Sequence, residues 1–172
     1  LNAGVDRLAM SCIMTVDARG DVIDHEICES VIRVNERMSY TSVKRILEDH
    51  DEEETTRYLE LVPMFEEMEQ LADILRNRRH QRGSIDFDFP ESKIMLDEEG
   101  HPTEIRSYDR NVATKIIEDF MLLANETVAE EYYWREIPFV YRVHEIPDED
   151  KIKKLAILIN NFGYSLHISD EV

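Results

Sequence analysis

The sequence predicts an α+β domain built mainly from antiparallel strands and hairpins, with several long helices packed on one side of the sheet. Short apolar runs joined by turns indicate the hairpins, and long segments with a 3.6-residue apolar period indicate the helices. The chain has 172 residues, of which 42% are apolar and 34% charged. This length and composition suit one globular domain with its own core.

The first predicted element is a β-hairpin. Residues 7–18 and about 22–34 are rich in Ile, Val, Met and Cys, and the run DARGD between them has the composition of a turn. Cys12 and Cys28 each lie in one of these strands, and their spacing is not that of metal ligands. We therefore expect buried, reduced thiols and a cytoplasmic protein.

A short helix is expected after the hairpin. Ser39 or Thr41 can cap it, and Val43, Ile46 and Leu47 give it an apolar face. The acidic run EDHDEEETT that follows predicts a polar loop exposed to solvent.

A long helix is then predicted from Thr55 or Thr56 to about Arg79, with Gly83 beyond its end. The apolar residues that keep its helical period are Leu59, Val62, Phe65, Met68, Leu71 and Leu75. The helix ends in the basic run RNRRHQRG, which complements the helix dipole. A contact with phosphate is the alternative interpretation of this run.

The second half of the chain predicts three more strands and two more helices. SIDFDFP and KIML are short strands, and the turn DEEGHP leads to a strand at about 103–107. A long helix from about Arg110 to Trp134 follows, and IPFVYRVHE reads as a strand with proline at its start. The closing helix has Asp148 near its start and Gly163 just past its end.

Composition and motifs exclude several kinds of site. The net charge of −18 argues against nucleic acid as a partner, because phosphate contacts need Lys and Arg. The sequence has no Gly-rich phosphate loop and no HExxH, CxxC or GxSxG motif, and its six histidines show no paired spacing. No apolar run is long enough to span a membrane, and nothing marks the chain for secretion. Because the chain opens without Met in a strand pattern, we expect a piece of a longer protein.

The run RGSIDFDFPE leaves three interpretations open. In a strand, Asp86 and Asp88 share one face, and Phe87 and Phe89 share the other. The two carboxylates suit a hard cation, or the strand has a solvent face backed by phenylalanines in the core. In the third interpretation, one phenylalanine lies at the rim of a cleft and stacks on a nucleobase.

A carboxylate on the helix at about 110–134 is the second candidate. The expected core face is Ala113, Ile116, Ile117, Phe120, Leu123 and Ala124, and Glu118 points away from it. The neighbours of Glu118 on its stripe are Asn111, Thr114, Leu122 and Asn125. This polar but mostly uncharged stripe suits a wall that meets a ligand, and a plain exposed face is the alternative.

Several blocks together resemble one family. SYTSV, RRHQRGSIDFDFPE, RNVATKIIEDFMLLANETVAE and PFVYRVHEIPDEDK, in this order, resemble the RNB catalytic domain of the ribonuclease II and ribonuclease R family. The opening LNAGVDRLAMSCIMTVDARGDV resembles a hairpin of the same domain, and the form RGSIDFDFPE is closer to ribonuclease R. Residues 1–172 would then be a partial RNB domain. The resemblance implies a processive 3′→5′ exoribonuclease that draws single-stranded RNA into a channel and releases nucleoside monophosphates.

The resemblance also implies roles for three residues. Tyr40 matches a tyrosine that contacts ribose near the RNA 3′ end, and Glu118 matches an acidic residue that works with it in preferring RNA over DNA. Phe87 matches the aromatic that closes the stack of terminal bases, so Asp86 and Asp88 are not expected to bind metal. The family's Mg²⁺ ligands and its scissile-phosphate arginine match positions outside this chain. We therefore expect no catalytic or metal residue here, and no activity from the isolated chain.

A rival hypothesis comes from another functional class. An acidic α+β module that binds proteins and no RNA would suit the charge of −18 and the acidic loop equally well. The order of the blocks favours the ribonuclease, whereas composition favours the rival.

Overall fold

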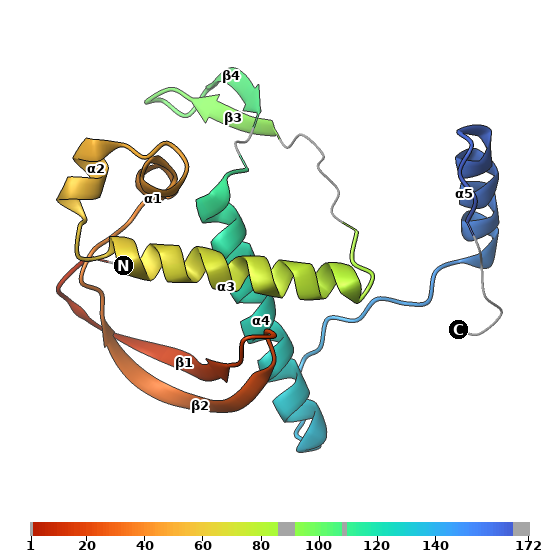
Figure 1. Ribbon diagram of the computed structural model, residues 1–172, viewed down its shortest axis with the longest axis horizontal. Helices are drawn as coiled ribbons and strands as arrows, with labels where there is room; N and C mark the ends of the chain where they lie inside the picture. Colours follow the sequence, from red (N-terminus) through yellow and green to blue (C-terminus); the bar gives the residue numbers. More distant parts are fainter. Residues whose placement is uncertain (1, 86–91, 108–109, 167–172) are drawn as a thin grey trace. The chain divides into compact units, whose positions relative to one another are not determined.

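The computed structural model describes residues 2–85, 92–107 and 110–166, and Figure 1 shows its elements. Within these residues the order of elements is β1 (Asp6–Val16), β2 (Val22–Arg33), α1 (Tyr40–Leu47), α2 (Glu52–Arg57), α3 (Val62–Gln81), β3 (Ser92–Leu96), β4 (Pro102–Ser107), α4 (Val112–Trp134) and α5 (Glu149–Asn161). The strands form two antiparallel pairs, so the predicted α+β class is confirmed. The chain divides into two units, Leu1–Ile137 and Pro138–Val172.

The predicted first hairpin is present. β1 and β2 pair antiparallel from Asp6 opposite Arg33 to Thr15 opposite Asp24, and a bulge follows Thr15. The Asp17 carboxylate organises the turn, because its Oδ1 accepts the backbone N–H groups of Arg19 (2.8 Å) and Asp21 (2.9 Å). These bonds, first that of Asp21, hold the pKa of the Asp17 carboxyl below its usual range.

The cysteines of the hairpin are unpaired thiols. Cys12 lies opposite Ile27 and Cys28 lies opposite Ser11, so the two side chains project from opposite faces of the hairpin. Both are half-buried rather than fully buried as expected, and burial raises the pKa of the Cys12 thiol. Their placement on opposite faces prevents a disulfide between them.

The hairpin packs on α3 through its turn and on α4 through one face. The turn residue Gly20 has φ of 83°, and a Cβ there would lie 3.2 Å from Ile74 of α3, so only glycine fits without adjustment. Arg78 of α3 donates to the Gly20 carbonyl. Met14 and His25 lie opposite each other in the register; the Met14 sulfur accepts the Thr127 hydroxyl, and the His25 ring lies 3.2 Å from the Glu131 carboxylate.

The acidic run after α1 was expected to be a loop, and this prediction was wrong. Ser39 caps α1 as expected, since its hydroxyl accepts the Ser42 N–H. A second short helix, α2, then begins after Asp51, whose carboxylate accepts the N–H groups of Glu53 and Glu54. Acidic residues in the first turn suit the positive end of a helix dipole, so this charge run stabilises a helix start.

The long helix α3 starts later than expected. The chain turns at residues 58–61, and α3 begins at Val62 with Pro63 in its first turn. Proline has no N–H to donate, so it suits the first turn, where helix N–H groups lack partners in any case. The apolar period could not place this break, because Leu59 fits the pattern but is exposed before the helix.

The second hairpin is also present in part. KIML lies within β3, and β4 covers the strand expected at about 103–107. The predicted strand SIDFDFP falls mostly on residues 86–91, which lie outside the described residues, and Ser84 and Ile85 before it are in no strand.

The strand predicted at IPFVYRVHE is wrong. Residues 138–148 form neither a helix nor a strand, and Val140 is 93% exposed. A strand needs a neighbour for its backbone N–H and C=O groups, and the described part of this unit offers none. α5 forms as expected, with Asp148 accepting the Lys151 N–H and Gly163 following the helix at φ of 82°.

The core of the first unit lies where α3 packs on α1 and α4. Its buried apolar residues are Ile46, Phe65, Ala72, Leu75, Ala113, Ile116 and Leu123. Figure 1 shows α3 crossing α4 at this contact. In the part of the chain that the structure describes, no helix is both long and apolar enough to cross a membrane.

Glu69 of α3 should make the fold less stable when it is ionised. Burial, followed by the nearby carboxylates of Asp73, Glu48 and Glu66, raises its pKa. A carboxyl whose pKa is raised by folding stabilises the fold below its unfolded pKa, and this contribution is lost as pH rises through the folded value. We expect Glu69→Gln to raise the free energy of unfolding at pH 7 by about 0.5 kcal/mol, the scale of partly exposed charge interactions.

Urea unfolding at several pH values measures this effect. The difference between Glu69→Gln and the wild type should vanish at about pH 3, where both side chains are neutral. Glu67→Gln changes an exposed carboxylate of the same helix and is the matched control. A gain that is equal in both variants, or that persists at low pH, would contradict the role of burial at Glu69.

Candidate nucleic-acid interface

Tyr40 lies at the rim of a pocket between three helices. It is the first residue of α1, directly after the Ser39 cap, and it is 49% exposed. The pocket has a volume of about 760 Å³ and is lined by Arg37, Met38, Ser39, Tyr40, Val43, Phe65, Met68, Ala113, Ile116 and Ile117. The Ser39 cap therefore fixes the backbone position from which the Tyr40 ring projects.

The pocket has an apolar interior and a polar rim. Phe65, Ala113 and Ile116 are buried, whereas Tyr40 and Arg37 are exposed. A nucleobase is flat and largely apolar on its faces, and a ribose carries hydroxyl groups at its edge. The arrangement of an apolar interior, a phenol and a guanidinium suits such a ligand.

Glu118 is not one of the residues that line this pocket, and on α4 it points away from the lining residues Ala113 and Ile116. It follows Ile117 on α4, its side chain is 45% exposed, and Arg110 Nη2 lies 3.1 Å from one carboxylate oxygen and 3.3 Å from the other. Because α1 contacts α4, Tyr40 and Glu118 come from neighbouring elements. Glu118 is half-exposed, in keeping with its expected position away from the core face, and Arg110 is a partner that the pattern did not indicate.

Asn111 and Thr114, two of the expected stripe neighbours of Glu118, cap the start of α4 rather than face a ligand. Asn111 is buried and caps α4, with its side chain accepting the Thr114 N–H while the Thr114 hydroxyl accepts the Asn111 N–H. This reciprocal pair satisfies two helix N–H groups. The polar stripe is therefore in part a helix start.

The sequence pattern missed Asp119, the largest fully buried side chain among the described residues. It is 2% exposed, and its two oxygens lie 2.5 Å from Arg76 Nη2 and 2.5 Å from Arg79 Nη1, both on α3. The expected core face of α4 placed Ile117 and Phe120 inside, but Ile117 is exposed and the buried line runs Ala113, Ile116, Asp119, Leu123 and Thr127. The arginines of RNRRHQRG could have indicated a buried acidic partner. Only the packing of α3 on α4 identifies that partner as Asp119.

The other arginines of the basic run also bind protein groups. Arg78 pairs with Asp21 as well as with the Gly20 carbonyl, and Arg82 donates to Glu126 at 2.6 Å. The hydrogen bond with Glu126 raises the pKa of Arg82. These contacts favour the structural interpretation of the run over a phosphate contact.

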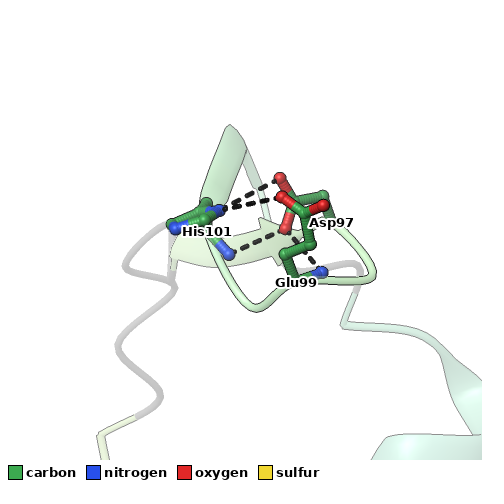
Figure 2. Close-up of side chains that lie close together, drawn as sticks. All are labelled: Asp97, Glu99 and His101. Carbon is green, nitrogen blue, oxygen red and sulfur yellow. Dashed lines mark hydrogen bonds and ion pairs between the residues drawn. The ribbon is translucent and has the colours of Figure 1, made fainter.

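One cluster of potential metal ligands lies in the turn between β3 and β4. Figure 2 shows Asp97, Glu99 and His101, with the Asp97 Oδ1 accepting the backbone N–H groups of the other two residues. All three are exposed, and one of the three ligands is a nitrogen. Mg²⁺ prefers oxygen ligands in an octahedral arrangement, so this turn does not fit that ion.

The third predicted site residue, Phe87, lies outside the described residues, as do Asp86 and Asp88. The three interpretations of their strand therefore remain predictions.

Comparison with known proteins gives consistent matches. The family model described as RNB domain matches residues 1–170. Ribonuclease R 2 of Lactococcus lactis is 39% identical over 97% of this chain and 26% of its own length, and ribonuclease R of Aquifex aeolicus is 40% identical over 96% and 23%. The chain thus spans about a quarter of the length of these curated relatives.

Solved structures agree with the sequence matches. Mycoplasma genitalium RNase R in complex with ribose-methylated single-stranded RNA superposes with a TM-score of 0.83 at 26% identity, over 99% of this chain and 26% of that one. The same protein in complex with double-stranded RNA also gives 0.83, over 99% of this chain and 30% of that one. The predicted resemblance is confirmed at the level of sequence and of fold.

Proposed function

Since this chain belongs to the RNB domain family, we propose that it is part of a 3′→5′ exoribonuclease that degrades single-stranded RNA processively to nucleoside monophosphates. In that enzyme this chain forms part of the wall of the RNA channel. The observation that carries this proposal is the half-exposed placement of Tyr40, at the rim of the pocket between α1, α3 and α4, and of Glu118 on α4, which contacts α1. Ribonuclease R relatives, one of them solved with single-stranded RNA, support it.

Sugar recognition is the chemistry that the Tyr40 phenol and the Glu118 carboxylate suit. The ribose 2′-hydroxyl is both a donor and an acceptor, so it can donate a hydrogen bond to a carboxylate while its oxygen accepts one from a phenol. Tyr40 supplies the phenol and Glu118 the carboxylate, from two helices in contact. RNA is therefore preferred over DNA, because a deoxyribose, which lacks this hydroxyl, leaves both groups unpaired.

Phosphodiester hydrolysis is assigned to other parts of the longer protein. Mg²⁺, the expected ion, supplies an activated water and stabilises charge on phosphate when it is bound. The only cluster of potential ligands found in residues 2–85, 92–107 and 110–166 does not fit Mg²⁺, as described above. This chain's own part is to bind and orient the RNA end.

Phe87 and the cellular location complete the proposal. Phe87 stacks on the terminal bases, as the resemblance implies. The cytoplasm is the proposed compartment, in keeping with the two unpaired thiols.

The proposal predicts that Tyr40 and Glu118 set sugar selectivity. In the full-length protein that carries this chain, Tyr40→Ala or Glu118→Ala should narrow the RNA:DNA preference by roughly tenfold, since an unpaired polar group costs about 1–3 kcal/mol. The measurement compares kcat/KM on matched single-stranded RNA and DNA oligonucleotides with identical base sequences.

Glu126→Ala is the matched control for Glu118→Ala. Glu126 lies on the same helix, has a similarly exposed side chain and is likewise paired with an arginine, but it is not one of the residues proposed to read the sugar. An RNA:DNA ratio unchanged in both Tyr40→Ala and Glu118→Ala would refute sugar reading by these residues. If the wild type does not degrade RNA, the proposed ribonuclease activity is refuted and the rival hypothesis of a protein-binding module is favoured.

A further inference from the structure

We propose that Arg110 is a positioning residue for sugar recognition, which orients the Glu118 carboxylate and neutralises its charge against the phosphates of bound RNA. This inference rests on the proposed function. Arg110 would act through Glu118 rather than as a group that performs hydrolysis.

The geometry of the pair supports orientation. Arg110 directly precedes the cap Asn111, and its Nη2 lies 3.1 and 3.3 Å from the two oxygens of Glu118, eight residues further along. Eight residues are about two turns of helix, so the arginine lies along the side of α4. The buried N-cap Asn111 fixes the backbone next to Arg110, and the Arg110 side chain is itself half-buried.

One nitrogen shared between two oxygens leaves the carboxylate able to bind more. An ionised carboxylate has about four acceptor positions, and a single guanidinium nitrogen between the oxygens leaves the outer ones open. A ribose hydroxyl can therefore donate to Glu118 while Arg110 still holds it. Holding the carboxylate in place before RNA binds also reduces the ordering that binding requires.

Charge gives the second reason for the pair. A chain with a net charge of −18 that binds RNA must limit repulsion where a carboxylate approaches the phosphate backbone. Glu118 is the carboxylate proposed to lie at the sugar, and the ribose in RNA is bonded directly to phosphate, so the charge of Glu118 lies close to the phosphate backbone. Arg110 cancels its charge at the place where repulsion would be largest.

Stability alone does not explain the pair. Ion pairs as exposed as Glu118 contribute little to stability, because water screens them. The chain contains a comparison: Arg82 at the C-terminal end of α3 pairs with Glu126 of α4, a carboxylate about as exposed as Glu118, and neither residue is proposed to act in sugar recognition. A role specific to Arg110 should therefore be absent from Arg82.

The experiment uses the full-length protein with Arg110→Met, Glu118→Gln, the double variant, and Arg82→Met as control. Steady-state rates on matched RNA and DNA oligonucleotides are measured at 50 and 300 mM salt, with the melting temperature of each variant. We expect Arg110→Met to lower kcat/KM on RNA about tenfold, mainly through KM, and to narrow the RNA:DNA ratio. The loss should shrink at 300 mM salt, because salt screens the exposed carboxylate.

The double variant is the decisive comparison. Adding Glu118→Gln to Arg110→Met removes the unpaired charge, so the KM for RNA should recover toward that of Glu118→Gln alone. Arg110→Lys keeps the charge without the planar guanidinium, so we expect a KM for RNA near the wild type with a narrowed RNA:DNA ratio. If Arg110→Met unfolds below the assay temperature, Arg110→Lys is the variant that tests the proposal.

Two results separate failure of this inference from failure of the proposed function. If Glu118→Gln narrows the RNA:DNA ratio while Arg110→Met and Arg110→Lys behave like Arg82→Met, sugar reading stands and the role of Arg110 is overturned. Additive losses in the double variant overturn it as well. If Glu118→Gln itself leaves the ratio unchanged, the proposed function fails at its sugar site.

Discussion

Replacing Asp119 by alanine should lower the free energy of unfolding by about 3–5 kcal/mol, because removing one partner leaves a buried charge without compensation. The carboxylate is 2% exposed, and Arg76 and Arg79 both bind it from α3 with side chains that are themselves largely buried. Urea unfolding of the purified chain measures the change, with far-UV circular dichroism as the signal.

Glu126→Ala is the matched control for this variant. It removes a carboxylate of the same helix that binds Arg82 in an exposed pair, so its cost should be at most about 1 kcal/mol. A loss below about 1 kcal/mol for Asp119→Ala would show that water or movement of α3 compensates the two arginines.

A triple replacement asks whether the three charges stabilise the fold or specify its geometry. Asp119→Leu with Arg76→Met and Arg79→Met replaces the ionic group by apolar residues, and such replacements are often neutral or stabilising. Wild-type stability in the triple variant would assign the charges to fixing the α3–α4 register. That register also fixes the position of Glu118, the neighbour of Asp119 on α4.

Phe65→Ala should cost about 3–5 kcal/mol, the usual range for removing a buried aromatic ring. Phe65 is 5% exposed, lies on α3 and lines the Tyr40 pocket, so its ring belongs both to the core and to the proposed binding surface. The same urea experiment measures the loss.

Met64→Ala controls for the change of sequence at this point of the helix. Met64 is exposed, so its replacement should alter the free energy of unfolding by no more than about 0.5 kcal/mol. Equal losses in the two variants would mean that Phe65 does not anchor the core.

Local signals predicted the elements with strong local causes. The hairpin β1–β2 follows from alternation and a turn, and Ser39 and Asp148 start helices because their side chains accept nearby N–H groups. The same chemistry formed α2 at Asp51, where the acidic composition suggested a loop. Composition failed there because the position of an acidic residue relative to a helix start decides its effect.

Features that depend on distant neighbours could not be predicted from periodicity. The strand expected at residues 137–145 had the right composition but no strand beside it in the described part of its unit. Asp119 interrupts an apolar face of α4. Its burial is possible because Arg76 and Arg79 of α3 pair with its carboxylate. In the same way Tyr40 and Glu118 were identified by resemblance, whereas the Arg110 contact required the folded helix.

The β1–β2 hairpin has a consequence for self-association. β1 has 11 residues and β2 has 12, and neither outer edge has a strand partner among the described residues. Leu8, Met10 and Val31 are exposed on one face near its open end. Long unpaired edges of this kind promote stacking of one copy on another, and the net charge of −18 opposes it by repulsion between copies. The acidity of the chain therefore protects its sheet edge, and salt, by screening that charge, weakens this protection.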